Sequence, residues 1–240
     1  MDQLLVALDV ESGTRALELA AAVRGIAGGI KIGSRLFTSE GPSIVRALAD
    51  KGDRVFLDLK FHDIPNTVAQ AVSAATSLGV WMLNVHASGG GPMMQAAFEA
   101  AAETADRENR QRPLVIAVTV LTSMNGATMA EAGVTGSVIE QVTRLARMTK
   151  AAGLDGVVAS AQETTLIRQA CGLDFAIVTP GIRGGAEVTS GKDDQERIMA
   201  APEAIAAGAS YIVVGRPIIA ASDPRAAAER IVSGISRFEP

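Results

Sequence analysis

The chain has 240 residues, of which 48% are hydrophobic and 20% charged, a composition typical of a globular protein with a sizeable core. The net charge is −4 and only 3% of the residues are aromatic, which argues against a basic surface or a base-stacking platform for nucleic acid. A single cysteine excludes an internal disulfide, and the first residues lack the pattern of a signal peptide. We therefore expect a cytoplasmic protein without a nucleic-acid partner.

One long uncharged segment raises the question of a membrane span. Residues 64–98 carry no formal charge when His86 is neutral, and a span needs about 20 apolar residues. Gly79, the glycines at 89–91 and Pro92 interrupt this segment. We therefore expect a buried helix and strand here, and no membrane partner.

Short apolar or β-branched runs recur along the chain, each followed by a polar residue or a glycine. In chain order, these predicted strands are 4–8, 29–32, 55–59, 80–85, 115–121, 156–159, 176–179 and 211–214. Their nearly continuous apolar character is typical of a parallel sheet that is covered on both faces. Their average spacing, roughly 30 residues, is the size of one strand–helix unit.

Alanine-rich amphipathic segments fall between these runs and predict helices. In chain order they are 14–23, 43–49, 67–78, 93–102, 138–151, 161–169, 202–207 and 224–233. Proline stands where several of them would begin, and glycine where several would end, as at Pro65 and Gly79.

Eight strand–helix alternations without a polar linker predict an α/β protein with a single domain over residues 1–240, a closed (β/α)8 TIM barrel. The alternative is an open, doubly wound sheet that binds a dinucleotide. That fold needs a glycine-rich turn directly after the first strand, where this chain has Asp9-Val10-Glu11-Ser12-Gly13. The pattern therefore favours the barrel.

Charged residues mark the ends of the first three predicted strands. Asp9 follows the first strand, Lys31 lies in the second, and Asp58, Lys60 and Asp63 lie at or just beyond the end of the third. The carboxyl ends of barrel strands form the active-site face. Asp58 and Lys60 are two apart, so both point to the same side of the strand. An isolated pair would fit a solvated salt bridge, but the convergence with Asp9 and Lys31 favours catalysis.

Lys60 is better suited to giving a proton than to attacking a carbonyl. A lysine that forms a Schiff base must be neutral, whereas Asp58 and Asp63 favour the ammonium form of Lys60. The same carboxylates oppose any substrate carboxylate placed beside them. The pattern fits a protonated lysine that delivers its proton to the carbanion left by departing CO₂.

The last two predicted strands indicate a phosphate site. Thr179-Pro180-Gly181-Ile182-Arg183 follows the seventh strand, and Gly215-Arg216-Pro217 follows the eighth. Barrel enzymes often bind phosphate with these two loops, where a glycine admits the anion to the backbone and an arginine adds a bidentate contact. Residues 184–194 are glycine-rich and polar, which predicts a lid over the bound phosphate.

The segment Asp58-Leu59-Lys60-Phe61-His62-Asp63-Ile64-Pro65-Asn66-Thr67 resembles the Asp-x-Lys-x-x-Asp signature of the orotidine 5′-phosphate decarboxylases. The resemblance covers nearly the whole chain, and the order and spacing of the segments are similar to those of the bacterial form. The other matching segments are Ala7-Leu8-Asp9, Lys31-Ile32-Gly33, Asn84-Val85-His86, Leu121-Thr122-Ser123, Val178–Arg183, Asp194-Gln195 and Val214–Pro217.

This resemblance implies a carboxy-lyase that converts orotidine 5′-phosphate to uridine 5′-phosphate and CO₂ in pyrimidine biosynthesis, with no metal and no organic cofactor. It implies that Lys60 protonates C6 of the pyrimidine, that Asp58 and Asp63 hold Lys60 beside the substrate carboxylate, and that Lys31 extends the catalytic network toward the ribose. It also implies a homodimer, in which Asp63 and Thr67 reach the neighbouring active site.

The resemblance further implies a set of substrate contacts. Asp9 would bind the ribose hydroxyls, and Thr122 and Ser123 the pyrimidine edge. The 5′-phosphate would be held by Arg183, Gln195, Gly215 and Arg216. The full set of implied substrate-binding positions is Asp9, Lys31, Asp58, Thr67, Thr122, Ser123, Pro180, Arg183, Gln195, Gly215 and Arg216.

Two other classes of function, a metal-dependent enzyme and a binding protein, fit a phosphate-binding barrel. A metal-dependent sugar-phosphate decarboxylase or a pentose-phosphate epimerase is disfavoured, because the chain has two histidines and the second strand carries Lys31, a poor ligand when charged. A non-catalytic nucleotide-binding barrel would not need the charged strand ends, and binding without turnover would distinguish it.

Overall fold

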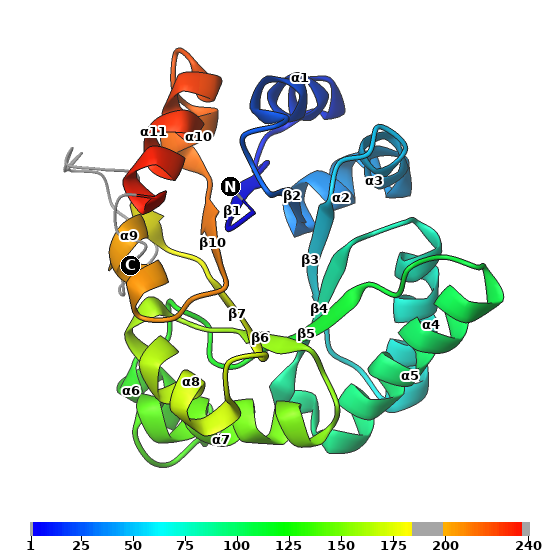
Figure 1. Cartoon of the computed structure of the whole chain (residues 1–240). Coiled ribbons are helices and arrows are strands. Elements are labelled where there is room, and N and C mark those ends of the chain that lie inside the picture. The colour runs from blue at the N-terminus through cyan, green and yellow to red at the C-terminus, as the bar shows by residue number, and fades with distance from the viewer. Residues whose placement is uncertain (1, 184–198, 237–240) are drawn as a thin grey trace.

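The computed structural model describes residues 2–183 and 199–236. Eight parallel strands close into a barrel in the spatial order β1-β10-β7-β6-β5-β4-β3-β2, which confirms the predicted (β/α)8 TIM barrel (Figure 1). The barrel strands are β1 (Leu4–Ala7), β2 (Gly29–Gly33), β3 (Val55–Phe61), β4 (Met82–His86), β5 (Leu114–Val118), β6 (Gly156–Val158), β7 (Ala176–Thr179) and β10 (Tyr211–Val214).

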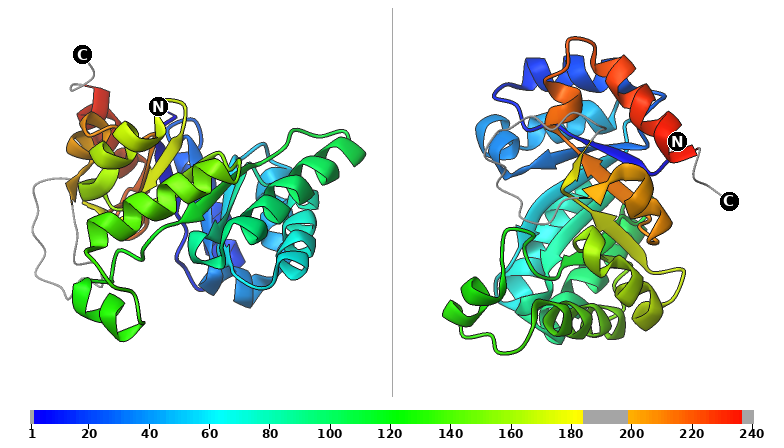
Figure 2. Two further views of the ribbon diagram at one scale, coloured as in Figure 1. Left: turned by 90° about the horizontal axis from the view of Figure 1, so that it is seen from below. Right: turned by 90° about the vertical axis from the view of Figure 1, so that its left-hand side faces the viewer.

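Helices follow the strands and surround the barrel, and α6 lies outside this ring at the end of the loop after β5 (Figures 1 and 2). The α-helices are α1 (Gly13–Val23), α2 (Ser34–Glu40), α3 (Pro42–Ala49), α4 (Pro65–Ser77), α5 (Gly91–Arg107), α6 (Gly126–Glu131), α7 (Val138–Ala151), α8 (Thr164–Cys171), α9 (Ala201–Ala206), α10 (Arg216–Ile219) and α11 (Pro224–Ser236). The remaining short elements are the 3₁₀ turns η1 (Ala87–Gly89) and η2 (Ala161–Glu163), and a strand pair outside the barrel, β8 (Ile182–Arg183) with β9 (Met199–Ala200).

Local sequence explains where several of these helices begin. Ser137 and Glu140 form a reciprocal capping box at the start of α7, in which the Ser137 hydroxyl accepts from the Glu140 backbone N–H at 3.2 Å. Pro65 occupies the first turn of α4, where no intrahelical partner is needed for the missing N–H. By contrast, α2 begins directly after β2, and Gly33 at its N-cap offers no side-chain hydrogen bond. The sequence pattern therefore did not predict α2.

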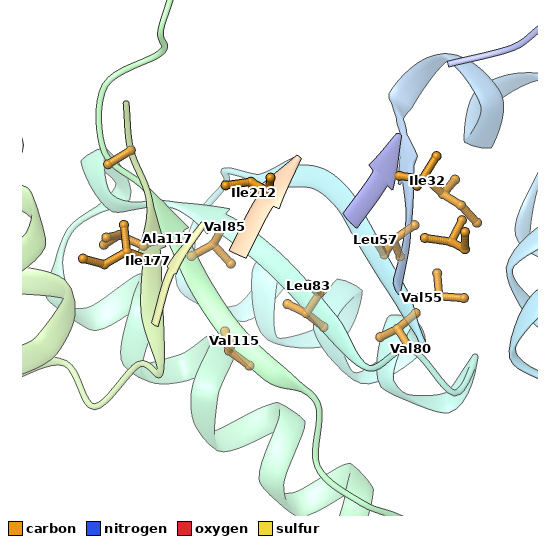
Figure 3. Close-up of a cluster of buried hydrophobic side chains, with 14 of the residues drawn as sticks. Ile32, Val55, Leu57, Val80, Leu83, Val85, Val115, Ala117, Ile177 and Ile212 are labelled. Atoms are coloured by element: carbon orange, nitrogen blue, oxygen red, sulfur yellow. The ribbon is translucent and has the colours of Figure 1, made fainter. Parts of the chain in front are cut away.

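The buried apolar residues lie in two layers. Side chains such as Ile32, Val55 and Leu57 gather on the outer face of the sheet, between the strands and the helices (Figure 3). A smaller cluster, which includes Leu5, Phe56 and Val213, comes from the alternate strand positions and fills the barrel interior. The period of two along each strand thus separates the two layers.

Aromatic side chains close the end of the barrel at which the strands begin. The rings of Trp81 and Tyr211 meet edge to face with centroids 5.3 Å apart, and the Arg54 guanidinium lies 4.0 Å from the centroid of Trp81. Polar side chains that face the interior are therefore found toward the opposite end, where the strands finish.

None of the helices within residues 2–183 and 199–236 is both long enough and apolar enough to cross a membrane.

Candidate active site

A cluster of charged side chains occupies the carboxyl ends of β1, β2 and β3. Asp58 lies at its centre: Oδ1 is 2.7 Å from Lys60 Nζ, and Oδ2 is 3.3 Å from Lys31 Nζ. Lys31 Nζ also lies 3.5 Å from Asp9 Oδ1. The strand ends thus bring together the four residues that the sequence pattern predicted to meet, in the order Asp9, Lys31, Asp58, Lys60.

The interior of this cluster is shielded from water. Lys31 is 9% exposed and the Asp58 side chain 13%, whereas the Lys60 side chain is 34% exposed and that of Asp9 53%. Burial acts to raise the pKa of Asp58, but the charges of Lys31 and Lys60, together with hydrogen bonds from Lys60 and Asn84, hold the pKa below its ordinary value. Asp58 is therefore ionised at neutral pH, and Lys60 faces the open side of the cluster.

The backbone of β3 departs from regular strand geometry at Lys60. The register against β4 shifts between Leu57 and Phe61, and Lys60 has a φ of 55°, in the left-handed region. A non-glycine residue in a sparsely populated region of this kind costs about 1–3 kcal/mol unless its surroundings fix it. Here the Lys60 N–H donates to Asn84 Oδ1 at 2.8 Å. Alternation along a regular strand predicts that Asp58 and Lys60 point to the same side, but it does not predict this left-handed bulge or its hydrogen bond to Asn84.

Asn84 is the one member of this network to which the sequence analysis gave no role. It lies in β4, is fully buried, and donates from Nδ2 to Asp58 Oδ1 at 2.7 Å. The available signal was a polar amide within an otherwise apolar strand, at the level of Asp58 in the neighbouring strand. Its contacts make it part of the cluster.

Asp63 and Thr67 lie away from the charged cluster of their own chain. Asp63 is exposed, and its Oδ1 accepts the backbone N–H of Ile64 at 2.6 Å. Thr67 is exposed in the first turn of α4. Within the described part of this chain, no ion pair joins Asp63 to Lys60. Nearby, Ile64 is 66% exposed although it is large and apolar.

The residues predicted to bind phosphate are only partly described. Gly215 directly follows β10 and lies against β1, because a Cβ built on it would be 3.5 Å from Ala7 Cβ and 3.7 Å from Asp9 Oδ2. This contact brings the loop of the last barrel strand beside the charged cluster. Arg216 follows Gly215 and is exposed.

The other predicted binding positions lie at the ends of β5 and β7. Half-buried Pro180 follows β7, and Arg183 lies in β8. Half-buried Thr122 and exposed Ser123 stand in the loop between β5 and α6. Gln195 and the predicted lid at 184–194 lie outside the described residues.

Two histidines stand next to the cluster. The rings of His62 and His86 are tilted, with centroids 5.4 Å apart. Burial, reinforced by the charges of His62 and Lys60, lowers the pKa of His86 below its ordinary value. Within residues 2–183 and 199–236, no three side chains among His, Cys, Asp and Glu are grouped so that they could hold a metal ion.

The closed barrel and the charged cluster at its strand ends are typical of the TIM-barrel class of enzymes, and comparison with known proteins identifies the family. The model of the orotidine 5′-phosphate decarboxylase / HUMPS family matches residues 2–231, and the chain belongs to that family.

Several similar proteins carry the narrower name. The orotidine 5′-phosphate decarboxylase of Syntrophotalea carbinolica is 55% identical over 96% of this chain and 93% of its own, and that of Chromobacterium violaceum 52% over 98% and 92%. The crystal structure of orotidine 5′-phosphate decarboxylase from Lactobacillus acidophilus superposes with a TM-score of 0.85 at 34% identity, covering 97% of this chain and 98% of that one. The predicted function, that of an orotidine 5′-phosphate decarboxylase, is thereby confirmed, and with it the predicted class of carboxy-lyase.

Proposed function

We propose that the chain decarboxylates orotidine 5′-phosphate with Lys60 as the proton donor. The bond between C6 and the carboxylate breaks, CO₂ leaves, and the electron pair stays on C6. The Lys60 ammonium gives its proton to C6, which yields uridine 5′-phosphate, and neutral Lys60 then regains a proton from water. The observation that carries this proposal is the Lys60 ammonium, bound to Asp58 at 2.7 Å yet open to the barrel mouth.

Asp58 and Lys31 prepare this proton transfer. Asp58 is ionised and faces Lys60, so a substrate carboxylate beside it experiences repulsion that ends when CO₂ departs. Lys31 lies between Asp58 and Asp9, and it keeps the buried Asp58 charge compensated. The charges thus favour the state after decarboxylation.

Substrate binding uses both sides of the barrel mouth. Asp9 is exposed beside Lys31 and accepts hydrogen bonds from the ribose hydroxyls. Thr122 and Ser123 meet the pyrimidine from the loop after β5. The 5′-phosphate binds at the far side, and the positions that hold it there are Pro180, Arg183, Gln195, Gly215 and Arg216.

The active site is completed by a second copy of the chain. Asp63 and Thr67 are exposed and point to no partner in the charged cluster of their own chain, and Ile64 between them is exposed and apolar. A homodimer that buries Ile64 places Asp63 beside the neighbouring Lys60 and Thr67 beside the neighbouring substrate.

We expect residues 1–240 to act as one domain in the cytoplasm, without a membrane or nucleic-acid partner, and to catalyse the reaction without a metal or organic cofactor. The alternative function, metal-dependent decarboxylation of a sugar phosphate, needs Mg²⁺ or a similar ion.

The test is the loss of ultraviolet absorbance of orotidine 5′-phosphate with the purified protein, in the presence and absence of EDTA. We expect rapid conversion that EDTA does not change. Folded protein that leaves orotidine 5′-phosphate intact but releases CO₂ from a sugar-acid phosphate when Mg²⁺ is present would contradict the proposal and establish the alternative.

A further inference from the structure

The amide of Asn84 connects two parts of β3 that the reaction depends on. Its Oδ1 accepts the backbone N–H of Lys60 at 2.8 Å, and its Nδ2 donates to Asp58 Oδ1 at 2.7 Å. Asn84 is fully buried, so water does not compete for either bond. One side chain from β4 therefore fixes both the backbone of the proton donor and the carboxylate that holds it.

The backbone at Lys60 needs such support. Lys60 has a φ of 55°, and the register between β3 and β4 shifts at this point, so the regular ladder gives the Lys60 N–H no backbone partner. Asn84 supplies the missing acceptor. Without it, the left-handed backbone at Lys60 would lose this support, and a change in its dihedral angles would shift the Lys60 ammonium relative to Asp58 Oδ1.

An amide meets both requirements at this position, whereas an ionised carboxylate or an apolar side chain does not. A carboxylate of the same shape accepts the Lys60 N–H but presents a second negative oxygen to Asp58 instead of a donor. An apolar side chain neither accepts nor donates a hydrogen bond. It leaves the Lys60 N–H without its acceptor and Asp58 Oδ1 with one hydrogen bond fewer. Asp58 Oδ1 now receives donors from both Lys60 Nζ and Asn84 Nδ2, and this pair of bonds fixes the plane of the carboxylate.

We propose that Asn84 is a positioning residue for the decarboxylation: its amide holds Lys60 in the left-handed bulge and orients Asp58, so that the ammonium points to C6 of the substrate. This inference rests on the proposed role of Lys60 as proton donor. Asn84 is fully buried and bonds to Lys60 and Asp58, so its loss lowers turnover and spares the affinity for uridine 5′-phosphate.

The sharpest test is Asn84→Asp, with turnover measured relative to the unmodified enzyme from pH 5 to pH 8. At pH 8 the new carboxylate opposes Asp58, and the misplacement of Lys60 lowers the relative turnover by about 100-fold. The positive charges that face it are Lys60 and Lys31, and burial beside Asp58 favours its protonated form as the pH falls. A protonated Asp at this position donates to Asp58 as the amide does, so the relative turnover rises by about tenfold toward pH 5.

A second variant, Asn84→Ala, provides an independent test if Asn84→Asp does not fold. It lowers turnover by about 100-fold while the affinity for uridine 5′-phosphate stays within about threefold. The matched control is Thr149→Val, which removes another fully buried polar group, one that bonds to Leu145 O far from the barrel mouth. The control keeps turnover within about twofold.

Any of three results would overturn the inference. The first is unchanged turnover in Asn84→Asp across the pH range, and the second is equal losses of turnover and product affinity in Asn84→Ala. The third is a loss of turnover in Thr149→Val as large as that in Asn84→Ala. Failure of the proposed function itself is distinguishable. If Lys60→Ala retains full turnover, the role of Lys60 is wrong. If Lys60→Ala is inactive and the Asn84 variants are normal, only the role of Asn84 is wrong.

Discussion

The two halves of the barrel mouth differ in kind. In the charged half, formed by β1–β4, side chains of opposite charge meet at 2.7–3.5 Å around Asp58. In the apolar half, formed by β5, β6, β7 and β10, the interior positions of the last three strands carry Val158, Val178 and Val213. The functional residues that we assign to this half lie beyond the ends of its barrel strands, in loops and in the short elements β8 and α10.

We assign the chemical step to the charged half, and mainly substrate binding to the residues beyond the strands of the apolar half. Charges held on rigid strands keep their positions during the reaction, and the low exposure of Asp58 and Lys31 strengthens their interaction. Loops can close around a substrate and open again. Changes in the charged half should therefore alter turnover more than affinity, and changes in the loops of the apolar half should alter affinity more than turnover.

The largest expected effect is that of Lys60→Ala in the charged half. Turnover of orotidine 5′-phosphate falls by about 10⁴-fold, because the proton donor is lost. The affinity for uridine 5′-phosphate, measured by calorimetry, stays within about tenfold, since Lys60 acts on C6 and not on the phosphate. Lys51→Ala, which removes an exposed lysine in the turn after α3, is the control and leaves both quantities unchanged. Turnover that survives in Lys60→Ala would contradict the assignment of proton transfer to the charged half.

Arg216→Ala tests the loops of the apolar half. The affinity for uridine 5′-phosphate falls by about 100-fold, because a charge-assisted contact to phosphate is lost, while the affinity for uridine changes little. Arg225→Ala, an exposed arginine paired with Glu229 on α11, serves as the control for loss of positive charge. Equal weakening of nucleotide and nucleoside would show that the phosphate binds elsewhere.

Mixing two inactive variants tests whether Asp63 serves the charged half of its own chain or that of a neighbouring chain. If Asp63 serves the neighbouring site, Lys60→Ala and Asp63→Ala chains that exchange at equal concentration leave one intact site in each mixed dimer. Random exchange then restores about a quarter of the unmodified activity. Size-exclusion chromatography with two differently tagged chains verifies exchange. Proven exchange with no recovery would place Asp63 in the site of its own chain or outside the reaction.

The smallest expected effect concerns His86, at the end of β4. Its pKa is lowered by burial and by neighbouring positive charge, so the unfolded chain binds a proton more readily than the folded chain below about pH 6.5. The free energy of unfolding therefore decreases as the pH falls from 6.5 toward the pKa of the folded state, by at most about 1.4 kcal/mol per pH unit. His86→Gln removes this slope in urea denaturation, whereas His62→Gln removes one of the neighbouring charges and reduces the slope only in part, because burial is the main cause. An unchanged slope in His86→Gln would assign the pH dependence to another group.

The sequence predicted the barrel and most of the charged half, because both depend on local patterns. Asp9, Lys31 and Asp58 lie in or directly after the first three apolar runs and thus fix which strands carry charge, and the barrel topology makes them converge. The left-handed conformation of Lys60 was not predictable, since it arises from the pairing of β3 with β4 and from the bond to Asn84. The role of Asn84 is therefore a tertiary property.

Other parts of the site could not be predicted from local patterns. Asp63 and Thr67 are exposed, and the role that we propose for them needs a second copy of the chain. The short helix α10 directly follows Gly215 without a side-chain cap, so its sequence carries little helical signal beyond Pro217. Gln195 lies outside the described residues, and its contact with phosphate stays a prediction.

The most direct measurement is the exchange of the C6 hydrogen of uridine 5′-phosphate for deuterium in D₂O, followed by proton NMR. Because each step of the reaction is reversible in principle, the group that protonates C6 after CO₂ leaves also removes that proton from the bound product. We predict exchange with the unmodified enzyme and none with Lys60→Ala at saturating uridine 5′-phosphate. Equal exchange by both proteins would show that a group other than Lys60 delivers the proton.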